Sequence, residues 1–247
     1  MIAPLAGPAD DGDPPTVTGV DGCAGGWVAV TLGPVKPPGR GGAVGVTAVS
    51  VAMAAELDGL PLSGVTGIDM PLGLLTAGWR DADLLARRAL GRRGVTVFAI
   101  PPRPVWECET YAEANRACRQ LTGKGLSIQA WGLRRKIAEA DEFRRRASSA
   151  LPRVLLYEVH PELSFAALAG APLGDSKHTR AGLAVRRELL AQAGITLPPA
   201  LAGAAENDLL DAAAVAWSAR RIAAGQSIAL TSPTQQADDG TEIAIRY

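Results

Sequence analysis

Short apolar runs separated by glycine and proline turns open the chain and predict β-strands. They cover residues 16–22, 26–33 and 42–50, and this pattern is typical of an antiparallel meander of three strands. Residues 51–60 are expected to form a short helix. Residues 63–70 then predict a buried strand that ends at Pro71, because proline cannot continue a ladder. A helix between two strands implies a right-handed crossover, so this fourth strand should run parallel to the first.

From residue 71 to about residue 150 the apolar spacing becomes helical and is interrupted by proline and glycine loops. Helices are expected around residues 86–90, 111–121 and 127–146, and this segment is interpreted as a helical insertion after the fourth strand. Residues 153–160 return to a strand pattern, which Pro161 ends. Three amphipathic helices should follow, from Glu162, over 178–193 and over 207–224, and residues 241–247 could add a terminal strand. The chain is therefore expected to be an α/β protein.

This pattern divides the chain into three parts. Residues 1–15 are rich in proline and aspartate and are expected to be a disordered arm. They lack the basic start and apolar core of a signal peptide. Residues 16–231 should form one domain that includes the insertion at about 71–150, and residues 232–247 a tail or edge strand.

Composition narrows the class of protein. With 47% hydrophobic and 20% charged residues, the chain is neither disordered nor collagen-like. Its three cysteines show no Cys-x-x-Cys spacing, which argues against a disulfide framework and favours the cytoplasm. With so few cysteines and histidines a zinc site is not expected. No apolar run reaches the length of a membrane helix.

Although the net charge is zero, basic and acidic residues are distributed unevenly along the chain. Residues 80–153 hold 16 of the 25 basic side chains and 8 of the 25 acidic ones. A basic segment beside acidic surroundings predicts a phosphate-bearing ligand held by arginines next to carboxylates that hold metal ions. Solvated faces of arginine-rich helices would give the same counts.

Acidic residues follow the predicted strands at their ends. Asp21 ends the first strand, Asp69 ends the fourth, and Glu158 lies near the end of the fifth. If these strands are parallel neighbours, their carboxylates meet at one edge of the sheet, where ligands of open α/β sheets bind. Asp208 and Asp211 share one face of the last helix. Oxygen ligands of this kind favour Mg²⁺ or Mn²⁺, and such a cluster could hold two ions for phosphodiester cleavage.

Each of these acids also has a simpler interpretation. Asp21 with Gly22 is typical of a hairpin turn, Asp69 could merely end a strand, and Asp208 could cap a helix. His160 shares a strand face with Glu158 and could act as an acid, a base or a structural residue.

Basic residues supply candidate phosphate ligands. Arg103 lies in a rigid proline-rich loop, where a fixed guanidinium could bind a phosphate in bidentate fashion. Lys177 and Arg186 follow the fifth strand.

A set of motifs occurs over residues 17–225 in the following order: VTGVDGCAGGWV, GIDMPLGL, RDADLLARRALG leading to VFAIPPR, YEVHPELSF, the pair Lys177 and Arg186, and NDLLDAAAVAW. As a set they resemble the bacterial and archaeal family known as domain of unknown function 429, described as predicted nucleases of ribonuclease-H-like fold. The resemblance implies a five-stranded mixed sheet of order 3-2-1-4-5 flanked by helices. It also implies a metal site at Asp21, Asp69 and Asp211, with Asp208 or Glu158 as a further ligand. The basic insertion departs from a minimal ribonuclease H.

The sequence is compatible with three functions. The first is a Mg²⁺- or Mn²⁺-dependent nuclease acting on nucleic acid, with Asp21, Asp69, Asp211 and Glu158 in catalysis and Arg103, Lys177 and Arg186 on phosphate. The second is a phosphotransferase of actin-like fold, in which the DGCAGG turn cradles a phosphate. The third is a catalytically silent binding module, which splayed or arginine-neutralised acids would favour.

Overall fold

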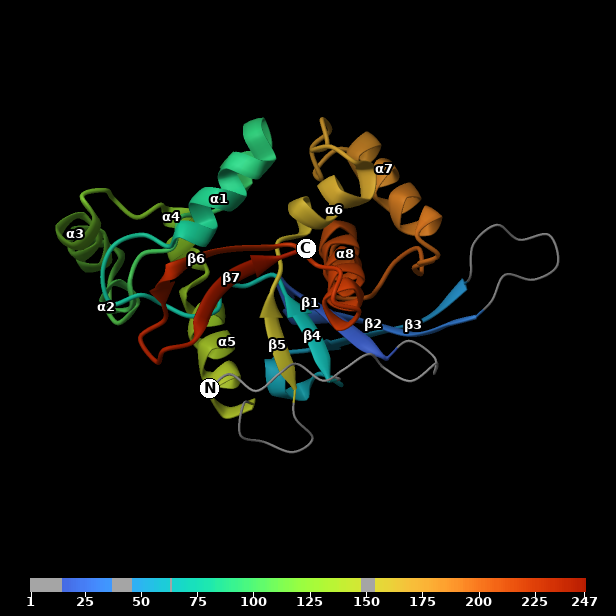
Figure 1. The fold of residues 1–247 in the computed structure, drawn as a ribbon, viewed down its shortest axis with the longest axis horizontal. Helices are drawn as coiled ribbons and strands as arrows, with labels where there is room; N and C mark the ends of the chain where they lie inside the picture. The colour runs from blue at the N-terminus through green and yellow to red at the C-terminus, as the bar shows by residue number, and fades with distance from the viewer. Residues whose placement is uncertain (1–14, 37–45, 63, 148–153) are drawn as a thin grey trace.

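The computed structural model describes residues 15–36, 46–62, 64–147 and 154–247, so the expected N-terminal arm lies outside the described residues apart from residue 15. A five-stranded mixed sheet of order β3-β2-β1-β4-β5 forms the centre of the fold (Figure 1). Its strands are β1 (Val17–Cys23), β2 (Gly26–Lys36), β3 (Val46–Ala54), β4 (Val65–Ile68) and β5 (Leu155–Glu158). β1 pairs with β2 antiparallel and with β4 parallel, and β4 pairs with β5 parallel. The expected α/β class and strand order are confirmed.

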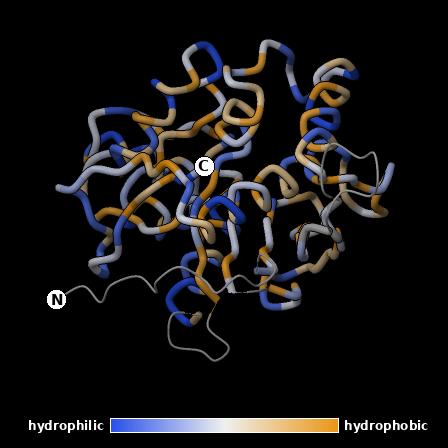
Figure 2. The backbone as a smooth tube through the Cα atoms, turned by 45° about the vertical axis from the view of Figure 1, so that its right-hand side comes forward, coloured by the Kyte–Doolittle hydropathy of each residue, from blue (hydrophilic) through white to orange (hydrophobic). Residues whose placement is uncertain are grey.

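Helices cover both faces of this sheet. One face packs against α6 (Pro161–Ala169), α7 (Arg180–Gln192) and α8 (Glu206–Ala223), with α8 lying across β1, β2 and β4. The other face packs against α5 (Arg134–Ala147) and the short 3-10 helix η1 (Leu57–Gly59). Hydrophobic stretches run along the central strands between these two layers (Figure 2). The site-bearing strands are therefore buried on both faces.

The segment after β4 is helical, as expected. It contains α1 (Asp81–Leu90), the 3-10 helix η2 (Gly91–Thr96), α2 (Arg103–Trp106), α3 (Tyr111–Thr122), α4 (Ile128–Gly132) and α5. α1 and η2 form one unit, because they follow each other directly and pack together. Thr110 and Glu113 form a capping box that starts α3.

The expected helix over residues 51–60 is wrong. β3 extends to Ala54 and pairs with β2, and only Leu57–Gly59 forms a single 3-10 turn. The alanines and methionine of this stretch allow a helix, but the ladder with β2 decides the conformation.

A terminal strand at the C-terminus is confirmed, with a partner that the sequence did not predict. β7 (Glu242–Arg246) pairs antiparallel with β6 (Ala229–Gln236) in a separate two-stranded sheet. The expected boundary at residue 231 therefore falls inside a strand. None of the described helices combines the length and the apolarity that crossing a membrane requires.

Candidate active site: an acidic pocket at the strand ends

Two neighbouring strands carry the same short motif in register. β1 contains Thr-Gly-Val-Asp at 18–21, and the end of β4 contains Thr-Gly-Ile-Asp at 66–69. Gly19 pairs with Gly67, and the amide of Asp69 donates to the carbonyl of Val20 over 2.9 Å. Since side chains alternate along a strand, each aspartate points to the same face as the glycine two residues before it. This face is the one that α8 covers.

The two glycines let α8 approach the sheet closely. A Cβ at Gly19 would lie 2.1 Å from the backbone nitrogen of Ala216, and a Cβ at Gly67 would lie 2.8 Å from the side chain of Val215. Asp211 is one turn earlier on α8 than these contacts, so the close packing brings its side chain to the ends of β1 and β4. Asp211 is 1% exposed and Asp21 is 7% exposed.

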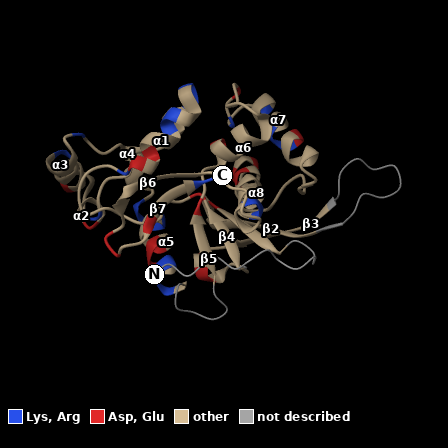
Figure 3. Cartoon of the chain, viewed as in Figure 1, with Lys and Arg blue, Asp and Glu red and all other residues tan. Residues whose placement is uncertain are grey.

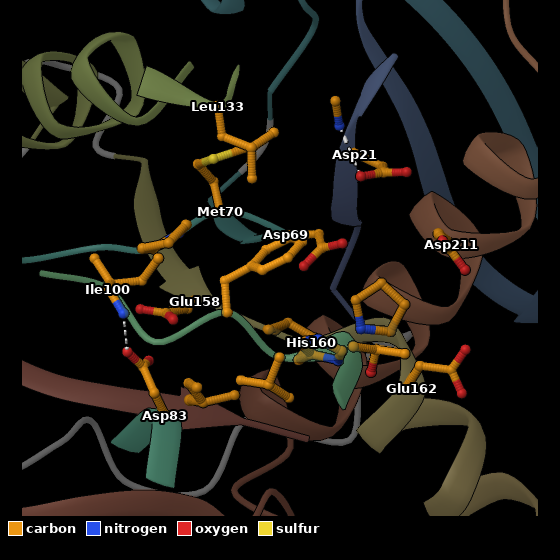
Figure 4. Close-up of a pocket in the computed structure, with 18 of the residues that line it drawn as sticks. Asp21, Asp69, Met70, Asp83, Ile100, Leu133, Glu158, His160, Glu162 and Asp211 are labelled. Atoms are coloured by element: carbon orange, nitrogen blue, oxygen red, sulfur yellow. Dashed lines mark hydrogen bonds between the residues drawn. The ribbon is translucent and has the colours of Figure 1, made fainter. Parts of the chain in front are cut away.

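These three aspartates line one side of a pocket of about 350 Å³ at the carboxyl ends of the strands. Figure 4 shows Asp21, Asp69 and Asp211 grouped together, with Glu158 and Asp83 on the opposite side. Much of the remaining wall comes from the end of η2 and the segment after it, from the start of α6 and from the loop before α7, including the following residues: Thr96, Val97, Phe98, His160, Glu162, Lys177 and His178.

Burial and mutual repulsion disfavour the charged form of all three aspartates. Burial raises the pKa of Asp21 well above its usual value, and the nearby charges of Asp69 and Asp211 raise it further. Burial also raises the pKa of Asp69 to about 6 and the pKa of Asp211 to about 6. A positive charge placed among them would relieve this cost.

In the structure this positive charge is an ammonium group. Lys177 Nζ donates to Asp211 Oδ2 over 2.5 Å. Burial opposes the charged form of Lys177, but Asp211, Asp69 and Asp21 together raise its pKa, so it stays protonated. Lys177 is therefore the counter-ion of the aspartate cluster.

The donor set has the chemistry that Mg²⁺ or Mn²⁺ requires, since it offers carboxylate oxygens that carry excess negative charge. As the side chains stand, no group of three or more acidic, histidine or cysteine residues in the described part of the chain is arranged to hold a metal ion. The carboxylate of Asp211 is instead engaged by Lys177.

Glu158 lines the same pocket, but its oxygens have other partners. Both accept from Arg80 over 2.6 Å, and one accepts from the amide of Leu72 over 2.8 Å. Arg80 is fully buried and also lies 3.4 Å from Asp83. Burial raises the pKa of Glu158 to about 7, and Arg80 opposes this shift. The structure therefore gives Glu158 a partner that the sequence did not predict, and its carboxylate ties β5 to α1.

Three other candidates lie outside the pocket wall. Arg103 forms ion pairs with Asp141 and Asp238. Arg186 is fully buried and donates to Glu162 over 2.6 Å. Asp208 is half-buried and accepts from the side chain of Asn207 over 2.6 Å, although its charge still acts on Asp21.

Glu162 was not among the residues singled out for the site, yet it belongs to the pocket wall. Burial favours its neutral form, but Arg186 and Arg93 lower the pKa of Glu162. Arg93 reaches it over 3.0 Å from η2, while one of its oxygens is buried without a hydrogen bond among the described residues. Its position just after a proline at the end of a strand is the signal that could have identified it.

His160 also faces this pocket. Burial lowers the pKa of His160, which Glu162 and Asp211 oppose, so the imidazole is neutral at pH 7. Its Nδ1 is buried and has no hydrogen-bond partner among the described residues. A neutral imidazole with a free nitrogen can accept or relay a proton.

Comparison with known protein families identifies the family of this chain. The family model described as protein of unknown function (DUF429) matches residues 19–236, which is most of the chain. No curated protein and no solved structure shows a significant match.

Proposed function

The chain belongs to the DUF429 family, whose description names no activity, and we propose from the acidic pocket that it is a divalent-metal-dependent nuclease of ribonuclease-H-like fold. The strand order and the position of the aspartates at the ends of β1 and β4 support this classification. Three free cysteines agree with a reducing, cytoplasmic setting, which we include in the proposal.

The observation that carries the proposal is the crowding of Asp21, Asp69 and Asp211. Each of them is held in a position where ionisation is costly, and no arginine pairs with any of them in the described part of the chain. Groups with such perturbed pKa values cluster at functional sites, because stability alone would not favour them.

The residues that would hold the ions are Asp21, Asp69 and Asp211, with Asp208 as a further ligand. Mg²⁺ or Mn²⁺ bound there would activate water and neutralise charge on a scissile phosphate. Lys177, once it no longer pairs with Asp211, presents its ammonium to a phosphate oxygen. His160 would hold a proton released in the pocket.

The phosphotransferase alternative receives less support from the local structure. β1 and β2 are joined by only two residues, Ala24 and Gly25, because Cys23 pairs directly with Gly26. Lys136 donates to the carbonyl of Gly26 and stacks on the ring of Trp27 at 4.4 Å. This tight two-residue turn offers no open loop for a phosphate.

A silent binding module predicts splayed or arginine-neutralised acids. The aspartates instead face one pocket and interact with one another, so this alternative is also disfavoured.

Metal-dependent hydrolysis of bis(p-nitrophenyl) phosphate, of duplex DNA and RNA, and of single strands tests the proposal. We expect activity with Mn²⁺ that chelation abolishes, and a loss of at least about 100-fold in Asp21→Asn, because a first ligand is removed. Mn²⁺ binding followed by electron paramagnetic resonance should weaken in the same variant.

Glu188→Gln is the matched control, because it removes an exposed carboxylate on α7 whose described partner is only Gln192. Equal activity of Asp21→Asn and Glu188→Gln, or hydrolysis that survives chelation, would refute the proposal.

A further inference from the structure

Several arginines of the helical segment are neutralised within the fold. Arg103, Arg144 and Arg145 pair with Asp141 on α5 and with acids of the turn between β6 and β7. These ion pairs attach the C-terminal hairpin to α2 and α5. Their charges are therefore not available to a partner.

The stretch formed by α1 and η2 differs. Residues 84–97 contain four arginines and no acidic residue, and Figure 3 shows basic residues alone at the end of α1 far from its acidic start. Arg87 and Arg92 are exposed and form no ion pair with a described carboxylate, whereas Arg93 pairs with Glu162. We call Arg87 and Arg92 the rim arginines.

The rim arginines lie on α1 and η2, and both of these elements contribute residues to the wall of the acidic pocket. Residues 96–98 line the pocket and follow Arg92 by four to six positions. The neighbour of Arg92, Arg93, reaches Glu162 in the pocket wall. Arg87 is one helical turn after Asp83, another lining residue, and acts on its charge. Across the pocket, His178 is exposed and Lys177 points to Asp211. A polyanion entering the pocket would meet positive charge on both sides.

We propose that α1 and η2 form a binding site for the phosphate backbone of a double-stranded nucleic acid, with Arg87 and Arg92 each contacting a phosphate. This inference rests on the proposed function, because it specifies the class of substrate that the same pocket would act on. Arginine suits this role because its planar fork bonds phosphate oxygens in bidentate fashion.

None of the described aromatic side chains is exposed, and Phe98 in the pocket wall is half-buried, which favours a duplex over a single strand. Proteins that bind single strands stack bases on exposed aromatic rings. The large hydrophobic residues exposed in the described part of the chain are all aliphatic, namely Leu84, Val95, Leu121, Ile128, Val185 and Ile228. Backbone contacts without stacking give sequence-independent binding that depends strongly on salt.

The test is the affinity for a fluorescein-labelled duplex of two helical turns, measured by anisotropy at several salt concentrations in EDTA, so that the proposed cleavage is blocked. The variant is Arg87→Gln/Arg92→Gln. Loss of two phosphate contacts should reduce the slope of log K against log salt by about 2 and weaken binding at least about tenfold.

The control is Arg88→Gln/Arg119→Gln, which removes the same charge. Arg88 lies on the side of α1 that lines a separate cavity against β6, and Arg119 is on α3. For this control variant, the slope of log K against log salt should equal that of the unmodified protein. Equal slopes for both double variants, or a single strand binding as tightly as the duplex, would overturn the inference.

Hydrolysis of bis(p-nitrophenyl) phosphate separates this inference from the proposed function. The small ester does not extend to the rim, so Arg87→Gln/Arg92→Gln should hydrolyse it at the unmodified rate. Duplex binding that needs the rim arginines, in a protein that hydrolyses nothing, would refute the nuclease and retain the binding site. Hydrolysis of the ester without duplex binding that depends on the rim arginines would refute the binding site and retain the nuclease.

Discussion

Replacing Gly19 by alanine tests whether the contact between β1 and α8 sets the spacing of the aspartates. The new methyl group would lie 2.1 Å from the nitrogen of Ala216 and 2.3 Å from the oxygen of Ala212. Both atoms belong to the helix backbone and cannot rotate away. Ordinary contact begins at 3.4 Å, so α8 must move by about 1 Å, and Asp211 moves with it.

The size of the effect follows from this geometry. Overpacking a core typically costs about 1–3 kcal/mol, and a backbone obstacle places Gly19→Ala at the upper end. Alanine restores about 0.4–1 kcal/mol by restricting the unfolded chain. A net loss of about 2 kcal/mol lowers the Tm by roughly 4–8 °C in a chain of this length. A shift of about 1 Å at a reacting group can cost about 100-fold in rate.

Thermal unfolding and Mn²⁺-dependent ester hydrolysis measure the two effects. Gly67→Ala should be milder, because its nearest neighbour is a side-chain atom of Val215 at 2.8 Å. Gly132→Ala, at the end of α4 with no atom within 4 Å, should be neutral or slightly stabilising. If Gly19→Ala unfolds at the same temperature as Gly132→Ala, the close approach of α8 does not control the site.

Three further predictions concern the charges. Asp69→Asn should match the unmodified protein in Tm below about pH 4 and exceed it above pH 6 in EDTA, because a carboxyl whose pKa is raised to about 6 stabilises the fold while protonated and loses this contribution as the pH rises; a constant difference at all pH values would contradict this. Hydrolysis should fall below about pH 6 as Asp69 and Asp211 take up protons, and a rate that stays level to pH 4.5 in a pH-rate profile would count against their role as metal ligands. Arg80→Met should cost about 3–5 kcal/mol in urea unfolding, because Glu158 and Asp83 lose their buried partner and must either keep an unpaired charge or take up a proton. Arg80→Met/Glu158→Gln should recover part of this, and no recovery would show that the pair is not the cause.

The central sheet could be predicted because its signals are local. Pro71 and Pro161 follow the ends of β4 and β5, and glycine turns separate the strands of the meander. The meeting of Asp21 and Asp69 then follows from parallel pairing alone. The Thr-Gly-x-Asp motif occurs on both β1 and β4, so it indicates that Asp21 and Asp69 lie at equivalent positions. Its glycines also indicate which face of the sheet α8 covers.

The partners of the basic residues could not be predicted, because they are distant in sequence. Arg103 pairs with Asp238, which lies on a hairpin whose first strand, β6, has no clear apolar alternation. Arg80 pairs with Glu158 only because α1 returns to the end of β5. An arginine in a rigid loop has the same local sequence whether it binds a ligand or another part of the chain.

Packing and charge are coupled in this pocket, and the coupling explains why the aspartates remain close despite their repulsion. Gly19 and Gly67 allow α8 to lie directly on β1 and β4, and this contact buries the side chains of the core on the same face. Separating Asp211 from Asp21 would require lifting α8 and exposing that core, which costs about 25 cal/mol per Å² of apolar surface. The hydrophobic contact therefore holds the carboxylates together. A cation, whether Lys177 or a divalent ion, changes the charge of the cluster without having to assemble it.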